Sequence, residues 1–353
     1  MKSFWDHIKE EKRPVVIYGT GNAAEKLFFL LKERGIRTMA FSSSSSFLRD
    51  RSFLGYKVLP LERIREIYGS DIVLLLGFGS HDESVIEHIV GLSKEYDLYM
   101  PDLLLTENGE VFSSLVVERE KREYEWAYSL LCDDLSRDVF SLSIEHRLTG
   151  RIESLLKIGR KEEENWNLLK LEDSSSFFDG GAYNGDTISL YRSKTQNKGD
   201  IYGIEPSFVS FRRMREKYGK EENIHLYNLA LGEKDGEGRM ELGHGRGNRI
   251  EEGKGTLIRS IDSILDGKSV DFIKLDIEGE EEKALEGGKE TICRFKPKLL
   301  ISAYHRSSDY WRILRKVFSI RDDYKVYMRK DISLPNWDTY YVLALNEKVN
   351  ATL

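Results

Sequence analysis

Short apolar runs alternate with amphipathic runs from about residue 13 to residue 90. Apolar runs bounded by glycine or polar residues are typical of buried strands, and leucines repeating at helical spacing indicate a helix packed on one face. The expected elements are strands at 14–18, 37–41 and 71–76, and helices at 25–34, 61–68 and from about 83. This order predicts a small α/β domain built on a parallel sheet.

The alternation resumes on a larger scale from about residue 151. Strands are expected near 177 and at 201–205, 224–227, 272–276, 299–303, 324–327 and 340–344. The last two follow one another with only a loop between them, whereas a purely wound dinucleotide fold would insert a helix there. We therefore predict a hairpin at the end of an otherwise parallel sheet.

The region between these two patterns lacks periodic strands. Residues 118–136 are rich in charge, with aromatics and leucines at helical spacing, which predicts a helical connector. A chain of 353 residues is long enough for two compact domains. The predicted division is a small α/β domain at 1–95, a helical connector at 96–150 and a larger α/β domain at 151–353.

Composition excludes several classes of protein. A net charge of -6 argues against generic binding of nucleic acid. No apolar run reaches the roughly 18 residues that span a bilayer, and the N-terminus lacks the apolar core of a secretory signal. Cys132 and Cys293 show no paired spacing and cannot form a metal cluster alone. A reduced, cytoplasmic setting without membrane contact is predicted.

The segment at 177–187 carries the strongest chemical signal. Two aromatics lead into Asp179, then into small residues with two glycines, then into a helix-forming run, so a strand, a tight turn and a helix N-terminus are expected. Such a turn lets a ligand lie against backbone amides. The segment lacks the Lys-Ser/Thr of a P-loop and the dinucleotide glycine spacing. Asp179 and Asp186 suit a neutral or cationic ligand, such as a sulfonium with an attached amino group.

Three acids follow predicted strands of the larger domain: Asp179, Glu205 and Asp276. Ligands of open α/β sheets bind beyond the carboxyl ends of the strands, where these side chains should meet. Glu205 lies 24 positions after Gly181, about where an acid can accept both ribose hydroxyls of a nucleoside.

Asp276 begins a dense acidic run that extends to residue 281. Asp276 and Glu278 are better placed for the cleft, whereas Glu280 is typical of a solvated helix start. A divalent metal could use these acids with His305. Oxygen-rich helix starts are common without one, so no metal is expected.

Five segments of the second half resemble the FkbM-type S-adenosylmethionine-dependent methyltransferases. They are 178–187 (FDGGAYNGDT), 204–207 (IEPS), 228–232 (NLALG), 272–281 (FIKLDIEGEE) and 296–305 (KPKLLISAYH), in the family's order. The resemblance implies an α/β fold with a seven-stranded, Rossmann-like class I methyltransferase sheet at 151–353. It also implies a second, smaller Rossmann-like domain at the N-terminus, and S-adenosyl-L-methionine as the cofactor.

The resemblance also implies roles for individual residues. The turn would surround the methionine part of the cofactor, Glu205 would bind the ribose, and the segment from Asn228 would lie against adenine. The implied cofactor-binding residues are Asp179, Gly180, Gly181, Ala182, Asn184, Asp186, Thr187, Glu205, Pro206, Asn228, Ala230 and Asp276. The candidate catalytic residues, which would face the methyl group and accept a proton, are Asp276, Glu278 and His305.

Two other features of the second half give weaker evidence of function. Tyr304 is expected to pack rather than react. The basic loop from Gly243 to Arg249 is a candidate lid or substrate-contacting loop, and a merely exposed loop fits it equally well.

The first domain carries a G-x-G-x-x-A match at residues 19–24. A nicotinamide dinucleotide site usually has an acid at the end of the next strand, which binds the ribose. This chain has Ser42 and Ser43 there. Ser42 with Arg49 or Arg51 could accept a 2′-phosphate, which leaves an NADP site open. We favour a non-catalytic Rossmann-like module for substrate presentation or assembly.

Three functions remain open at this point. The leading one is methylation of a hydroxyl of a sugar or specialised metabolite. The second keeps the cofactor but methylates a side-chain amide nitrogen of a peptide, for example Asn. The third is a nucleotide or nucleotide-sugar binding scaffold whose methyltransferase fold is idle. The expected partner is a small-molecule, glycan or peptide acceptor, and a homo-oligomer is compatible with the sequence.

Overall fold

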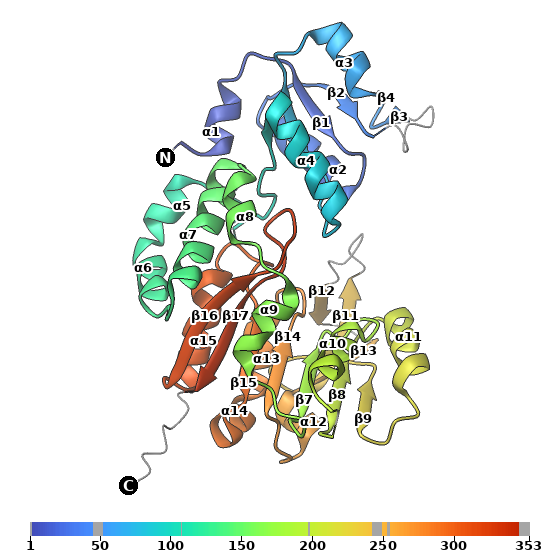
Figure 1. The fold of residues 1–353 in the computed structure, drawn as a ribbon, viewed down its shortest axis with the longest axis vertical. Coiled ribbons are helices and arrows are strands. Elements are labelled where there is room, and N and C mark those ends of the chain that lie inside the picture. Colours follow the sequence, from blue (N-terminus) through green and yellow to red (C-terminus); the bar gives the residue numbers. More distant parts are fainter. Residues whose placement is uncertain are drawn as a thin grey trace. The chain divides into compact units, whose positions relative to one another are not determined.

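The computed structural model describes residues 2–44, 52–106, 108–196, 198–241, 249–252 and 255–345 (Figure 1). The chain forms two compact units, and each is built from separate segments. Unit 1 contains Met1–Tyr124, Asp138–Lys161 and Lys330–Asp338, and unit 2 contains Glu125–Arg137, Glu162–Arg329 and Thr339–Leu353. The predicted limits at residues 95 and 150 follow the sequence pattern alone, whereas this division follows packing in space.

Unit 1 holds a six-stranded sheet in the order β3-β4-β2-β1-β5-β6. Its strands are β1 (Val15–Tyr18), β2 (Thr38–Ser42), β3 (Ser52–Phe53), β4 (Tyr56–Leu59), β5 (Val73–Leu76) and β6 (Asp97–Tyr99). β1 runs parallel to β2 and β5, and β3 forms an antiparallel pair with β4. The sequence did not predict β6, because only three residues pair there and the run is too short to show a period.

The helices of the first half include the predicted ones. They are α1 (Phe4–Lys9), α2 (Asn22–Glu33), α3 (Leu61–Tyr68), α4 (Glu83–Glu95), α5 (Ser114–Arg119), α6 (Lys121–Ser129), α7 (Asp134–Thr149) and α8 (Glu153–Ile158). The leucines of α2 that repeat at helical spacing, Leu27 and Leu31, are fully buried against Ile17 and Phe41 of the sheet. Burial of such a side chain contributes about 1.5–3 kcal/mol.

Unit 2 holds a seven-stranded sheet in the order β16-β17-β15-β14-β7-β8-β9. Its strands are β7 (Phe177–Gly180), β8 (Ile201–Ile204), β9 (Ile224–Tyr227), β14 (Phe272–Leu275), β15 (Lys298–Ser302), β16 (Tyr324–Lys330) and β17 (Thr339–Leu345). Neighbouring strands from β15 to β9 are parallel, and β17 is antiparallel to β15. The predicted α/β class is confirmed.

Both faces of this sheet are covered. Its helices are α9 (Glu162–Trp166), α10 (Asp186–Lys194), α11 (Phe208–Tyr218), α12 (Ile261–Leu265), α13 (Glu281–Gly287), α14 (Lys289–Phe295) and α15 (Asp309–Ile320), with a 3₁₀ turn, η2 (Asn167–Leu169). On one face Phe177 stacks on Phe272 and on Tyr191 of α10, each with ring centroids 4.8 Å apart. The alternating residues Phe178 and Ile273 point to the other face and are equally buried.

A second, four-stranded sheet in unit 2 has the order β10-β13-β11-β12. Its strands are β10 (Ala230–Leu231), β11 (Gly236–Glu241), β12 (Arg249–Glu252) and β13 (Thr256–Arg259). The basic loop from Gly243 to Arg249, the candidate lid or substrate-contacting loop, lies outside the described residues, except that the backbone of Arg249 begins β12.

Two further observations concern the chain as a whole. Within the described residues, no helix combines the length and apolar character needed to cross a lipid bilayer. Cys132 and Cys293 are both exposed and unbonded.

Candidate functional site

Three adjacent strands of unit 2, β14, β7 and β8, end together at the carboxyl edge of the sheet. Asp179 lies in β7, Glu205 directly follows β8, and Asp276 directly follows β14. Since the three strands are parallel, their acids converge on one edge, as the sequence predicted.

The turn after β7 needs glycine for two reasons. Gly181 has φ +82°, and a Cβ atom there would lie 1.9 Å from the carbonyl oxygen of Asp276. The N–H groups of Gly181 and Ala182 both donate to the carbonyl of Ile204, at 3.0 and 2.9 Å. Gly185, with φ +79°, then caps the N-terminus of α10. The predicted strand, tight turn and helix start are confirmed, and the turn is fixed against both neighbouring strands.

Glu205 is held beside this turn by two backbone hydrogen bonds. Its Oε2 accepts the N–H of Tyr183 at 2.9 Å, and its Oε1 accepts the N–H of Ser207 at 2.7 Å. The residue is 7% exposed, and burial raises its pKa in spite of these two bonds. Tyr183 itself adopts a left-handed conformation, with φ 46°. The carboxylate of Glu205 is therefore oriented before any ligand arrives.

Asp179 is fully buried and forms an ion pair with Lys274 of β14. Lys274 Nζ donates to Asp179 Oδ1 at 3.2 Å. Burial raises the pKa of Asp179 to about 6, although the charge of Lys274 acts in the opposite direction. Asp179 Oδ2 and Asn184 Oδ1 are buried and accept no hydrogen bond from any described residue. Two acceptors therefore remain unsatisfied at the turn.

Lys274 was not among the predicted site residues. The sequence did contain a signal for it, a lysine inside an otherwise apolar strand. A buried lysine needs an anionic partner, so one of the strand-end acids could have been expected beside it. The pKa of Lys274 is raised, because the charges of Asp179 and Asp276 outweigh its burial, which would lower it.

Four residues form an acid–histidine cluster next to this turn: Asp276, Glu278, Glu281 and His305. His305 Nε2 lies 3.3 Å from Asp276 Oδ1 and 3.6 Å from Glu278 Oε2. Its Nδ1 lies 3.1 Å from Glu281 Oε1. Glu281, the first residue of α13, is 2% exposed and also accepts the N–H groups of Ile277 and Gly279. The three predicted catalytic residues thus come together, joined by Glu281, which the sequence did not single out.

Electrostatics in the cluster favour charged forms. Burial lowers the pKa of His305, but the carboxylates of Glu281, Asp276 and Glu278 raise it to about 10. Burial raises the pKa of Asp276, but Lys274 and then His305 hold it below its usual range. Tyr304 does more than pack, because its hydroxyl donates to Asp276 Oδ1 at 3.2 Å.

The remaining predicted residues surround the three acids less closely. Asp186 is exposed at the start of α10, followed by the buried Thr187. Asn228 donates from Nδ2 to the carbonyls of Glu205 and Pro206, at 2.8 and 3.0 Å. Ala230, two positions after Asn228, is buried in β10. The segment predicted to lie against adenine is therefore tied to the ribose-binding candidate.

Comparison with known protein families shows which family the residues at this edge of the sheet resemble. Residues 179–325 match the model of the methyltransferase FkbM domain. This part of the chain is an FkbM methyltransferase domain. The FkbM domain begins at Asp179 itself and contains Glu205 and the whole acid–histidine cluster. A methyltransferase is therefore supported, and the family resemblance predicted from the sequence is confirmed.

A solved structure agrees on the fold. The crystal structure of methyltransferase FkbM from Methylobacillus flagellatus KT matches with a TM-score of 0.74 and 22% identity, covering 94% of this chain and 90% of that chain. Precorrin-6y C5,15-methyltransferase from Geobacter metallireducens GS-15 gives a TM-score of 0.33 at 13% identity, covering 51% of this chain and 83% of that one.

Fibrillarin from Aeropyrum pernix, solved with natively bound S-adenosyl-L-methionine, gives 0.33 at 14% identity and covers 53% of this chain and 75% of that one. Scores this low support no statement about the present chain. A search of curated proteins found no match.

Proposed function

We propose that the FkbM domain transfers a methyl group from S-adenosyl-L-methionine to a hydroxyl of a sugar or specialised metabolite. The observation that carries this proposal is the pair of acids, Asp179 and Glu205, held at adjacent strand ends on either side of a glycine turn. Such a turn and two strand-end acids suit a nucleoside that carries a cationic amino acid.

The unsatisfied acceptors fit the amino-acid part of this donor. Asp179 Oδ2 and Asn184 Oδ1 are buried oxygen acceptors without a donor among the described residues. Buried polar groups are rarely left unpaired in folded proteins. An ammonium group supplies up to three N–H donors and a positive charge, which complements both oxygens. These two residues would hold the methionine end of the donor.

The ribose part fits Glu205. Each of its oxygens already accepts one backbone N–H, which leaves further lone pairs on both oxygens for the two ribose hydroxyls. Asn228, which is bonded to the carbonyl of Glu205, would then border the adenine. The donor would thus lie along one edge of the sheet, from Asn184 to Asn228.

For this reaction the protein must mainly align the acceptor oxygen, the methyl carbon and the sulfur. Methyl transfer from a sulfonium is an in-line displacement with a good leaving group, and positioning can supply on the order of 7–11 kcal/mol. A general base adds about a hundred- to ten-thousandfold in rate. Asp276, Glu278 and His305 form one cluster beside the proposed donor site, so the proton of the acceptor hydroxyl has carboxylate oxygens to receive it, and His305 holds these carboxylates together.

We further propose that unit 2 is a class I methyltransferase fold and that the smaller sheet of unit 1 is a non-catalytic Rossmann-like module. Ser42 ends β2 where a nicotinamide site would carry an acid. Beyond β5, Ser80 forms a β-bridge with Leu334, and a Cβ on Gly79 would lie 2.5 Å from the Trp337 ring. The chain itself therefore covers the loop after β5. The free cysteines agree with a cytoplasmic setting.

Calorimetry with S-adenosylhomocysteine tests the donor site, and incubation of extracts with methyl-labelled donor identifies the acceptor. We expect stoichiometric binding and a labelled hydroxyl product. A labelled peptide would instead support methylation of an amide nitrogen. Absence of heat with S-adenosylhomocysteine, together with clear binding of NADP or a sugar nucleotide, would overturn the proposal in favour of a binding scaffold.

A further inference from the structure

The acid–histidine cluster offers more ligand atoms than a proton relay requires. Asp276, Glu281 and His305 each present one atom, and the three atoms lie within 4.8 Å of one another. Glu278 Oε2 stands beside them, 3.6 Å from His305 Nε2. The sequence alone predicted no metal here, because acids at a helix start are common. The structure adds a buried imidazole at their centre.

His305 supplies the observation that points to a ligand. Its side chain is 8% exposed, and neither ring nitrogen makes a hydrogen bond of good geometry to any described residue. The carboxylates stand 3.1–3.6 Å from these nitrogens, but none of them meets both the distance and the angle of a hydrogen bond. Two ligands of one cation, each about 2.0–2.2 Å from it, lie roughly 3.0–3.5 Å apart and off the nitrogen's lone-pair axis. The distances of Asp276 and Glu278 from Nε2, 3.3 and 3.6 Å, are close to that arrangement, whereas Glu281 faces the other nitrogen, Nδ1.

Carboxylates also gather at this edge of the sheet. Asp179 pairs there with Lys274, and Asp276, Glu278 and Glu281 all face the imidazole of His305. A donor carrying a sulfonium, an ammonium and a carboxylate adds only one net positive charge. Carboxylates grouped around one imidazole supply the oxygen ligands that a divalent cation takes.

We propose that the acid–histidine cluster binds a divalent transition-metal ion, with Mn²⁺ as its representative. A mixed set of one imidazole nitrogen and carboxylate oxygens suits Mn²⁺, Fe²⁺ or Zn²⁺ better than Ca²⁺, which takes oxygen ligands alone. Asp276, Glu278 and Nε2 of His305 are the central ligands, and the ion replaces the proton on that nitrogen. Glu281 faces Nδ1 and orients the ring. Two backbone N–H groups already hold Glu281, so its contribution costs little reordering.

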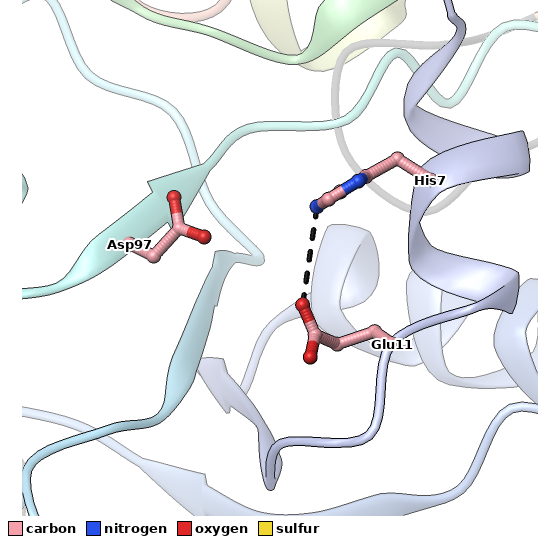
Figure 2. Close-up of side chains that lie close together, drawn as sticks. All are labelled: His7, Glu11 and Asp97. Carbon is pink, nitrogen blue, oxygen red and sulfur yellow. Dashed lines mark ion pairs between the residues drawn. The ribbon is translucent and has the colours of Figure 1, made fainter.

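A second group of similar composition differs in that fixed cations pair with its carboxylates. His7, Glu11 and Asp97 of unit 1 also lie within ligand range of one another (Figure 2). There the guanidinium of Arg13 lies 2.6 Å from both Glu11 and Asp97, and Arg151 lies 2.8 Å from Asp97. Fixed cations already satisfy those carboxylates, so this group serves as an internal control.

The role of the ion in catalysis rests on the proposed function. A divalent ion at this position would bind the acceptor hydroxyl and lower the pKa of that hydroxyl. Binding of the ion itself requires neither donor nor acceptor, so the two proposals can fail separately.

To test the site, Mn²⁺ is titrated into the full chain in the absence of methyl donor, and its binding is measured by electron paramagnetic resonance. We expect one tightly bound Mn²⁺ per chain. Asp276→Asn and His305→Gln should each weaken binding about tenfold or more, since even outer partners of metal ligands affect affinity that strongly. Glu280→Gln, an acid of the same segment, and Glu11→Gln, from the internal control, should bind as wild type does.

Pulsed electron paramagnetic resonance on the wild-type protein tests the site even if the variants do not fold. Mn²⁺ bonded to His305 should show nitrogen modulation from one imidazole. Absence of stoichiometric Mn²⁺ binding, absence of nitrogen modulation, or unchanged affinity in folded Asp276→Asn and His305→Gln would each overturn the proposal. None of these results affects binding of S-adenosylhomocysteine, which tests the proposed function.

Discussion

Replacing Glu205 by glutamine tests the proposed ribose contact while keeping the size of the side chain. The wild-type carboxylate accepts the N–H groups of Tyr183 and Ser207 on separate oxygens. A glutamine amide can accept only one of them and turns its NH₂ group toward the other. It also loses the charge that strengthens hydrogen bonds to ribose hydroxyls. Hydrogen bonds to charged groups contribute about 1.5–3 kcal/mol each.

Loss of one or two such bonds should weaken binding of S-adenosylhomocysteine by about 2–4 kcal/mol, or about 30- to 900-fold. Isothermal calorimetry on wild type and Glu205→Gln measures this directly. Glu222→Gln, at an exposed acid of the same unit, is the matched control. If folded Glu205→Gln binds within about threefold of wild type, Glu205 does not contact the ribose.

Three further predictions address the turn, the cluster and unit 1. Gly181→Ala should lower the free energy of unfolding by about 3 kcal/mol or more, because its Cβ meets a backbone oxygen at 1.9 Å, whereas Gly236→Ala, with open space, should stay within about 0.5 kcal/mol in urea titrations; similar losses in both would refute the close approach. Asp276→Ala should reduce the rate of single-turnover methyl transfer far more than it reduces affinity for S-adenosylhomocysteine. A wild-type rate in this variant would show that Asp276 takes no part in the reaction. Burial lowers the pKa of His146 to about 4, although its hydrogen bond to the Arg151 carbonyl acts in the opposite direction. The unfolded chain therefore binds this proton first, and stability present above pH ~6.5 should fall by about 3 kcal/mol as pH drops to about 4. His146→Gln should lose that part of the pH dependence, and parallel curves for the two proteins would contradict the assignment.

The sequence predicted the parts of the fold that rest on local pattern. The strands around Phe177 and Phe272 stand out because each is a continuous apolar run that the sheet buries on both faces. The carboxyl-end rule then placed Asp179, Glu205 and Asp276 at one edge, since it depends only on the strands being parallel.

Features that depend on distant packing escaped prediction. Lys330–Asp338, between two strands of unit 2, belongs to unit 1, where Leu334 pairs with Ser80. Glu281 resembles any acid of a helix start until the fold brings His305 to it across 24 positions of the chain. The sequence cannot show which of several adjacent acids turns inward, because that depends on the backbone at Glu278, whose φ is 59°.

A crystal structure of the full chain with S-adenosylhomocysteine tests the central claim most directly. The account predicts ribose hydroxyls on the carboxylate of Glu205 and the amino group within hydrogen-bond distance of Asp179 Oδ2 and Asn184 Oδ1. Density for the ligand elsewhere, or a turn at 179–187 that stays unaltered and uncontacted at saturating ligand, would contradict it.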